Sequence, residues 1–154
     1  FIQRYQQLTR LPLPNKSLID VGKLVNSVAS MFTEAVFEVS ETKLEVYADE
    51  EQLKQVLINL VKNAIEAMNH KPEGVIKIEW FKQNNQVEIH VLDEGTGINN
   101  LENLFVPFYT TKAQGSGIGI VLCRQIIMNH SGDLTINNRD DGCGAKASVF
   151  LPAS

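Results

Sequence analysis

The sequence predicts an α+β domain, a two-layer α/β sandwich in which helices cover one face of a mixed, mostly antiparallel sheet. Two observations predict this class. Apolar residues switch several times between helical spacing and strand spacing along the chain, and the strand-like segments come in pairs between the helices. The length of 154 residues suits one such domain with a single core.

Two prolines mark the one clear boundary in the chain. Pro12 and Pro14 forbid helix in the stretch LPLPNKS and favour an extended linker. Residues 1–10, which precede this stretch, have the character of a helix end. We therefore expect residues 1–18 to be the end of a preceding helix with its linker, and residues 19–154 to form the domain.

Capping residues and apolar stripes predict two helices in the N-terminal half. Asp20 can cap a helix whose apolar positions have helical spacing: Val21, Leu24, Val25, Val28 and Phe32. Asp49 can cap a longer helix that runs to about Met68. The apolar stripe of this long helix consists of Leu53, Val56, Leu57, Leu60, Val61, Ala64 and Ile65. Short strands are expected between the two helices, at residues 36–39 and 44–47.

A β-hairpin should follow the long helix. Residues 75–81 and 87–92 alternate between apolar and polar side chains, and residues 83–86 (QNNQ) form the turn between them. Strands joined by so short a turn should pair antiparallel.

The last third of the chain begins with an irregular segment. Residues 93–119 contain five glycines and little periodicity, and a segment of this length inside a compact domain is usually functional or mobile. A helix over about residues 119–130 follows, and Ser131-Gly132 ends it. The closing hairpin is expected to pair residues 134–137 with residues 146–151.

The composition excludes several functions. The net charge is −4, whereas a nucleic-acid binder should carry a basic patch. Cys123 and Cys143 form no CxxC pair and the three histidines lie far apart, which argues against a zinc site. Two unpaired thiols fit a reducing cytoplasm.

No apolar run approaches the roughly 18 residues of a membrane helix. Since the chain begins with Phe1 inside an amphipathic stretch, we interpret it as part of a longer protein whose missing segments could carry a membrane anchor.

The long helix carries the first candidate site. Asn59, Asn63 and Glu66 are spaced i, i+4, i+7 and lie away from the apolar stripe, so they should form a polar ridge. An amide oxygen is a hard ligand that can bind Mg²⁺ without adding charge beside a polyphosphate. The alternative is that this ridge is an ordinary solvated helix face.

The second candidate site is Asp93-Glu94-Gly95-Thr96-Gly97, directly after an apolar strand. A carboxylate at a strand end can accept a hydrogen bond from an exocyclic amine, and the glycines allow the backbone to approach a planar ring. The alternative is an ordinary Asp/Gly turn.

The third and fourth candidate sites lie in the irregular segment. Residues 115–119 (GSGIG) lead directly into a helix, and glycine-rich backbone at a helix N-terminus binds phosphate well. The segment matches neither a P-loop nor a dinucleotide-binding turn. Residues 104–112 (LFVPFYTTK) could form a lid over a nucleotide, with Lys112 reaching a phosphate. The alternative is a loop that Phe105 and Phe108 hold against the core.

Taken in order, the four segments resemble the N, G1, F and G2 boxes of sensor histidine kinases. They read QVLINLVKNAIEA, DEGTG, LFVPFYTTK and GSGIGI, and the closing GCGAKASVFLP looks like the last hairpin of the family. These kinases belong to the superfamily shared with gyrase, the Hsp90 chaperones and the mismatch-repair ATPases. The resemblance covers about residues 19–153 and implies the Bergerat-type ATP-binding fold. PFYTTK is most like the nitrogen-regulation branch, and RYQQLTRLPLP looks like the end of the dimerisation helix with its linker.

The resemblance also implies a role for each matching residue. Asn63 would be the Mg²⁺ ligand, and Asp93 would be the carboxylate that reads adenine. Asn59 and Glu66 would be catalytic, and residues 98–116 would form the ATP lid. The expected contacts to ATP are Asn59, Lys62, Asn63, Asp93, Gly95, Gly97, Ile98, Phe108, Thr110, Thr111, Lys112, Gly115, Ser116, Gly117, Ile118 and Gly119.

Some positions depart from the family pattern. Hydrolysing ATPases of the superfamily have a glutamate at the position of Asn59 that activates water, and an amide cannot act as that base. Glu66 stands where many relatives have a basic residue; it could polarise the attacking histidine or be solvated. Ala145 and Ala147 replace a threonine and a phenylalanine in the last hairpin. No phosphoacceptor motif surrounds any of the three histidines, His70, His90 and His130.

The sequence therefore predicts the ATP-binding catalytic domain of a two-component sensor histidine kinase, with ATP and Mg²⁺ as cofactors. Its acceptor histidine would lie on a dimerisation domain outside this chain. The other expected partner is a response regulator, and the full-length protein should be a homodimer. The alternatives are a hydrolysing ATPase of the same superfamily and a non-enzymatic module that has lost ATP binding.

Overall fold

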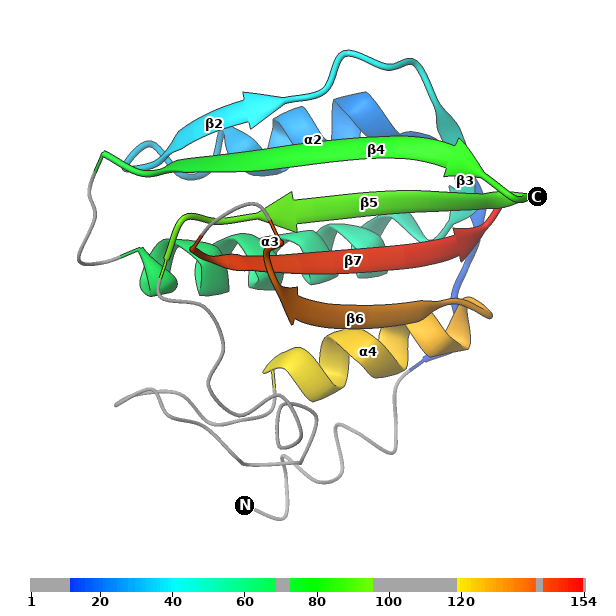
Figure 1. Cartoon of the computed structure of the whole chain (residues 1–154). Helices are drawn as coiled ribbons and strands as arrows, with labels where there is room; N and C mark the ends of the chain where they lie inside the picture. The colour runs from blue at the N-terminus through cyan, green and yellow to red at the C-terminus, as the bar shows by residue number, and fades with distance from the viewer. Residues whose placement is uncertain (1–11, 69–72, 96–118, 141–142, 154) are drawn as a thin grey trace.

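The structure is a computed structural model that describes residues 12–68, 73–95, 119–140 and 143–153. Its centre is a five-stranded sheet in the order β2-β4-β5-β7-β6 (Figure 1). The strands are β2 Val36–Val39, β4 Val75–Gln83, β5 Gln86–Leu92, β6 Asp133–Asn138 and β7 Ala145–Pro152. β2 runs parallel to β4, and every other pair in this sheet is antiparallel.

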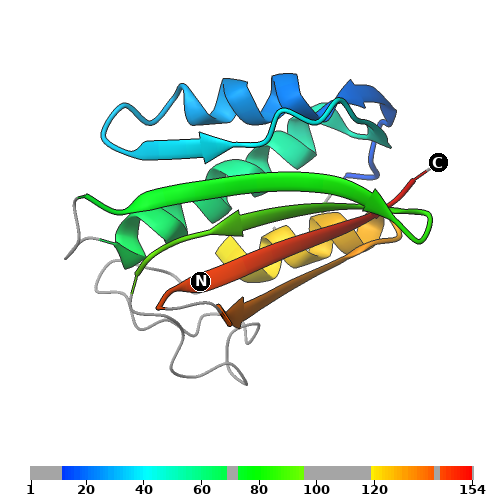
Figure 2. The same ribbon diagram turned by 45° about the horizontal axis from the view of Figure 1, so that its top comes forward.

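The helices of the described part of the chain cover one face of this sheet, as Figure 2 shows. They are α2 Val21–Ala29, α3 Glu50–Ala67 and α4 Gly119–Asn129. The expected α+β class, with helices on one face of a mixed and mostly antiparallel sheet, is confirmed. None of the helices in the described part of the chain is long and apolar enough to cross a membrane.

A second, two-stranded sheet was not expected. β1 Ser17–Asp20 pairs antiparallel with β3 Glu45–Ala48, whereas the sequence placed residues 17 and 18 in the linker. β1 has four residues, of which only Ile19 is buried, so it lacks the alternating pattern from which a strand is recognised. β1 is a strand because it pairs with β3, and this pairing cannot be predicted from the local sequence.

The first helix is shorter than its apolar spacing suggested. Asp20 caps α2 as expected, because its carboxylate accepts a hydrogen bond from the Lys23 N–H at 3.1 Å. The helix ends at Ala29, after which Met31 and Phe32 make i→i−3 turn bonds. Phe32 therefore lies beyond the helix, although its side chain still packs against the core.

The β4–β5 hairpin closes on a two-residue turn. Asn84 and Asn85 both have positive φ, 53° and 62°, which is the backbone of a type I′ turn. Asparagine tolerates this left-handed region better than most residues. Both strands consequently extend to the turn itself, with Gln83 paired to Gln86.

The core lies between α3 and the sheet. Six of the seven residues of the predicted stripe are buried, and the seventh, Ile65, packs against the core while partly exposed. The helix begins at the predicted cap, because Asp49 accepts a hydrogen bond from the Gln52 N–H at 3.1 Å. The sheet side of the core is formed by Ile76, Ile78, Trp80, Ile89, Val91, Leu134, Val149 and Leu151.

A buried histidine joins the end of α4 to the start of α3. His130 has 1% of its surface exposed. Its Nδ1 lies 2.8 Å from the Ile126 carbonyl, and its Nε2 accepts a hydrogen bond from the Asp49 N–H at 3.0 Å. Since Nε2 is the acceptor, Nδ1 carries the proton, and the imidazole is neutral in this arrangement.

Replacing His130 with alanine should therefore destabilise the domain. The change removes two hydrogen bonds and leaves a cavity, so the free energy of unfolding should fall by about 2–4 kcal/mol. Urea unfolding measures the effect. Met128→Ala is the control, because Met128 is half exposed on the same helix and its loss should cost less than about 0.5 kcal/mol. Equal losses in both variants would contradict the bridging role.

Candidate functional site

The second candidate motif lies where the sequence placed it, directly after β5. Asp93 is 6% exposed. Its Oδ1 accepts two backbone hydrogen bonds, from the Gly95 N–H at 2.9 Å and the Ala145 N–H at 3.1 Å. Its own N–H donates to the Ala145 carbonyl at 3.0 Å. The carboxylate is thus held rigidly between the end of β5 and the start of β7.

This environment shifts the ionisation of Asp93. Burial raises the pKa of the carboxyl above its usual value, while the hydrogen bonds from Gly95 and Ala145 and the positive charge of Arg139 act in the opposite direction. The hydrogen bonds from Gly95 and Ala145 both end on Oδ1. The second carboxylate oxygen, Oδ2, is the acceptor that we expect to meet an amine donor on a ligand.

Two residues that support Asp93 were not recognised from the sequence. The Arg139 guanidinium donates to the Asp93 carbonyl through Nη1 at 3.0 Å. Gly144 has φ of +129°, and a Cβ built there would lie 2.0 Å from the same carbonyl oxygen. The close glycine pair in the closing GCG motif was the available sequence clue, because it precedes a strand that must approach another backbone.

The alanine at position 145 does not weaken this support. Many histidine kinases that the sequence resembles have a threonine at this position, so the hydroxyl of that threonine is missing here. In the structure it is the backbone of Ala145 that holds Asp93, through both its N–H and its carbonyl. Ala147 is also buried, in register with Val91 on the neighbouring strand.

The residues after Asp93 fasten this site to the end of α3. The Glu94 carboxylate accepts a hydrogen bond from the Val75 N–H at 2.8 Å, and the Glu94 N–H points to the Met68 sulfur at 3.3 Å. Gly95 packs so closely that a Cβ would lie 2.4 Å from the carbonyl oxygen of Ala67. The glycine therefore permits contact between two backbones, and Asp93 lies close to the C-terminal end of α3.

The polar ridge on α3 is present. Asn59 and Asn63 are partly buried, whereas Lys62 and Glu66 are exposed. Both Asn63 and Glu66 make polar interactions within the chain. Burial raises the pKa of the Cys123 thiol of α4, and the side chain of Asn59 acts in the opposite direction. Within the described ranges, no group of three or more His, Cys, Asp or Glu side chains could hold a metal.

The donor chemistry on the ridge still fits Mg²⁺. Magnesium commonly keeps several waters and takes only one or two protein oxygens together with substrate phosphates. The amide oxygens of Asn59 and Asn63 can serve in this way, and neither depends on a cluster of carboxylates.

Most of the glycine-rich segment lies outside the described residues. This holds for the expected ATP contacts Gly97, Ile98, Phe108, Thr110, Thr111, Lys112, Gly115, Ser116, Gly117 and Ile118. Gly119 is described and is the first residue of α4. Among the described residues, nothing lies within 4 Å of a Cβ built at this position, so the packing of that part of the chain does not require glycine here.

The two described glycines should respond differently to alanine. Gly95→Ala should lower the free energy of unfolding by about 1–3 kcal/mol, because its Cβ would overlap the backbone of α3. Gly119→Ala should be neutral or stabilising, by up to about 1 kcal/mol, because alanine is the better helix former. Urea unfolding of both variants provides the comparison. A stable Gly95→Ala protein would contradict the close contact with Ala67.

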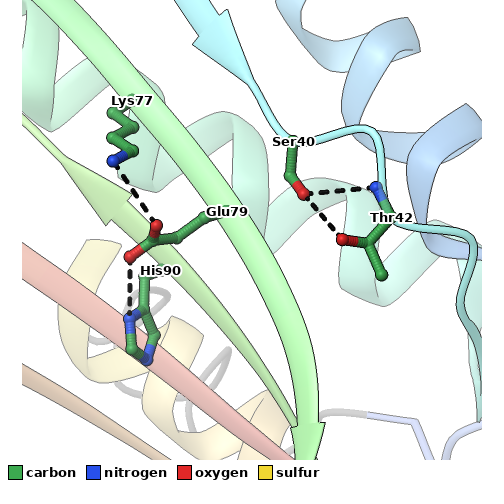
Figure 3. A network of polar contacts seen from close by, with 5 residues as sticks. All are labelled: Ser40, Thr42, Lys77, Glu79 and His90. Carbon is green, nitrogen blue, oxygen red and sulfur yellow. Dashed lines mark hydrogen bonds and ion pairs between the residues drawn. The ribbon is translucent and has the colours of Figure 1, made fainter.

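Neither described histidine is suited to accept a phosphoryl group. On the open face of the sheet, Lys77, Glu79 and His90 form a chain of contacts (Figure 3). Lys77 lies 3.7 Å from Glu79, and His90 lies 3.6 Å from Glu79 and 3.1 Å from Glu88. His90 is 8% exposed and His130 is 1% exposed. His70 lies outside the described residues.

These features together define a class of protein. Three helices on one face of a mixed sheet, with a buried carboxylate near the end of a long helix that carries a polar ridge, match the ATP-binding domains that histidine kinases share with gyrase and the Hsp90 chaperones. The chain belongs to the family of histidine kinase-, DNA gyrase B- and HSP90-like ATPases, and the family model matches residues 48–154.

Individual relatives point to the kinases within this family. Sensor histidine kinase ZraS of Escherichia coli O157:H7 is 32% identical over 146 residues, which cover 88% of this chain and 31% of that relative. The chain thus spans less than a third of that relative's length. The solved catalytic domain of histidine kinase ThkA is 34% identical with a TM-score of 0.78, covering 90% of this chain and 96% of that one. ThkA in complex with response regulator protein TrrA is 29% identical, with a TM-score of 0.81. The match covers 99% of this chain and 46% of the ThkA chain.

The comparisons confirm the resemblance to histidine kinase catalytic domains. The narrower expectation of a nitrogen-regulation branch stays a prediction.

Proposed function

We propose that this chain is the ATP-binding catalytic part of a two-component sensor histidine kinase. It would donate the γ-phosphate of ATP to a histidine on a separate dimerisation domain. The observation that carries this proposal is Asp93, whose buried carboxylate is oriented by two backbone N–H groups next to the end of α3. Such a carboxylate can read the exocyclic amine of adenine, and the family membership of the chain supports ATP as the ligand.

The metal in this proposal is Mg²⁺. Asn63, with Asn59 one turn before it, would hold the ion through amide oxygens on the polar ridge of α3. The ion would neutralise charge on the triphosphate. The residues of the chain would bind and orient ATP so that an incoming histidine nitrogen can approach the γ-phosphorus in line. Lys62, Glu66 and the residues of the lid, 98–116, belong to this proposed site by resemblance.

Transfer to histidine is favoured over hydrolysis by the residue at position 59. Asn59 is partly buried on the polar ridge of α3. An amide has no basic lone pair that could take a proton from water. We therefore expect slow ATP turnover when no acceptor histidine is present.

The remaining partners are proposals of the same kind. Residues 1–18 would be the end of the dimerisation helix and its linker, and the full-length protein would be a homodimer. A response regulator would accept the phosphoryl group from the histidine, since the ThkA structure contains such a regulator. We expect the domain to work in the cytoplasm, with any membrane anchor in segments outside this chain.

The test separates binding from transfer. The chain alone should bind Mg-ATP without labelling itself, and it should transfer the γ-phosphate to one histidine of the upstream helical hairpin of the parent protein. The product should be acid-labile and base-stable, as expected for a phosphorus–nitrogen bond. Transfer should be inefficient, because separation of the domains removes the high effective concentration that a linker provides.

Other outcomes would assign the chain elsewhere. Fast phosphate release without an acceptor would place it among the hydrolysing ATPases. Lack of ATP binding in a calorimetric titration would indicate a non-enzymatic module. Strong labelling of the chain by itself would show that one of its own histidines is an acceptor.

A further inference from the structure

The linker before β1, residues 12–16, is fastened to the first turn of α3 at two points. The Asn15 N–H donates a hydrogen bond to Oδ2 of Asp49 at 2.8 Å. Three residues earlier, the Pro12 carbonyl accepts a hydrogen bond from Nε2 of Gln52 at 3.1 Å. Asp49 is the N-cap of α3, and Gln52 lies in its first turn. Two attachments three residues apart fix the direction of the linker as well as its position.

Helix capping alone does not account for Asp49. An N-cap side chain needs one oxygen, and Asp49 uses Oδ1 to accept from the Gln52 N–H. Asp20 caps α2 with nearly the same backbone, φ −77° and ψ 111° against φ −83° and ψ 113° at Asp49, and it also caps through Oδ1. At Asp49 the second oxygen receives the linker. Each oxygen of this carboxylate therefore has a separate task.

The ionisation of Asp49 strengthens both contacts. Burial acts to raise the pKa of its carboxyl, but the backbone N–H groups of Asn15, Gln52 and Glu51 outweigh burial and hold the pKa below its usual value. Hydrogen bonds to an ionised carboxylate are stronger than those between neutral groups. The backbone N–H of Asp49 is held as well, by Nε2 of His130. Asp49 thus joins the linker to α3 and to the end of α4.

The prolines of the linker make this attachment easier. Pro12 and Pro14 restrict the chain before it is attached, so that less conformational entropy is lost when the linker is held. Leu13, between them, has 86% of its surface exposed. The hydrogen bonds to Pro12 and Asn15 therefore hold the linker, without help from burial of this apolar side chain.

We propose that Asp49 and Gln52 form a clamp that fixes where the linker leaves the domain. The proposal rests on the proposed function, in which the linker leads to the dimerisation domain with the acceptor histidine. Asn59 and Asn63 lie on the same helix, roughly 15 and 21 Å beyond Asp49 at about 1.5 Å per residue. The clamp thus holds the linker and the proposed Mg²⁺ ligands on one rigid element. If it opens, residues 12–16 join the flexible tether, and the effective concentration of ATP at the acceptor histidine falls.

Amide exchange tests the clamp without nucleotide. Asp49→Asn keeps an oxygen for the cap, because asparagine caps helices as well as aspartate, but it turns an NH₂ group towards the Asn15 N–H. Asp20→Asn is the matched control, since it removes the same charge from the N-cap of α2. In this chain, NMR should show a protected Asn15 amide in the wild type and in Asp20→Asn, and about tenfold faster exchange or more in Asp49→Asn. Equal exchange in the three proteins, or an unprotected Asn15 amide in the wild type, overturns the proposal.

Phosphoryl transfer in the parent protein tests the role of the clamp. Asp49→Asn and Gln52→Ala should each slow transfer to the acceptor histidine about twofold or more at saturating Mg-ATP, because the tether becomes longer. The ATP affinity should stay unchanged, and Asp20→Asn should transfer at the wild-type rate. Gln52→Ala leaves the cap of α3 in place, so its effect does not depend on capping. Unchanged or faster transfer in both clamp variants, or an equal loss in Asp20→Asn, overturns the proposal. A wild-type chain that fails to bind Mg-ATP would refute the proposed function instead, and the exchange of Asn15 would still report the clamp.

Discussion

Replacing Asp93 with asparagine should weaken ATP binding at least tenfold and leave the domain folded. The new amide can still accept the hydrogen bonds from Gly95 and Ala145 through Oδ1. It would present an NH₂ group where the carboxylate presents Oδ2, so the proposed adenine amine would meet a donor. Loss of a charged acceptor in a closed pocket costs about 1.5–3 kcal/mol, which corresponds to a tenfold or larger change in affinity.

Calorimetric titration of the wild type and of Asp93→Asn with ATP measures this effect. Asp133→Asn is the matched control, because Asp133 lies half exposed beside Arg124, near the end of α4, and should leave the affinity unchanged. Equal affinities of the wild type and Asp93→Asn would remove Asp93 from the adenine site.

The same substitution should not lower the stability of the ligand-free domain at neutral pH. Burial raises the pKa of Asp93 above 3.8, so the ionised carboxylate is less favourable in the folded chain than in the unfolded one. The stability that the protonated carboxyl contributes is fully present below the pKa of the unfolded chain. It is lost as the pH rises through the higher pKa of the folded chain. Asparagine never ionises. The variant should therefore be at least as stable as the wild type at pH 7, and any advantage should shrink as the pH falls to about 4.

Urea unfolding at the two pH values tests this sign. A variant that is clearly less stable than the wild type at pH 7 would mean that the hydrogen bonds of Asp93 depend on its charge. A gain in stability with a loss of binding would instead be the trade-off expected of a site that buries a carboxylate for its ligand.

The second large effect concerns the metal. Asn63→Ala should abolish the Mg²⁺-dependent gain in ATP affinity, because it removes the proposed ligand oxygen from the polar ridge of α3. The fold should remain intact, since alanine is the best helix former and Asn63 lies outside the apolar stripe. Asn59→Ala should have a milder effect.

ATP titrations in Mg²⁺ and in EDTA measure this gain. Gln55→Ala serves as the control on the same helix, because Gln55 is exposed two turns before Asn63. If EDTA changes the ATP affinity equally in the wild type and in Asn63→Ala, the ligand assignment is wrong.

The parts of this protein that could be predicted from sequence are those with a local physical cause. Asp49 caps α3 and the apolar stripe defines its buried face, because both act within a few residues. The β4–β5 hairpin follows from alternation and a turn of two asparagines that accept positive φ. Asp93 was recognised for the same reason, since a carboxylate followed by spaced glycines directly after an apolar strand is a local pattern.

Contacts between distant segments could be decided only by the tertiary structure. The hydrogen bond from Ala145 to Asp93 spans 52 positions in the chain, and the support from Arg139 and Gly144 arises at the same junction. Pairing in the small β1–β3 sheet is equally non-local. The sulfur of Cys123 lies 4.0 Å from the Val56 carbonyl oxygen of α3 only because α4 packs on α3. Local sequence patterns thus predicted most of the elements and the candidate residues of the site, whereas the packing of helices and strands decided which backbone groups and side chains surround those residues.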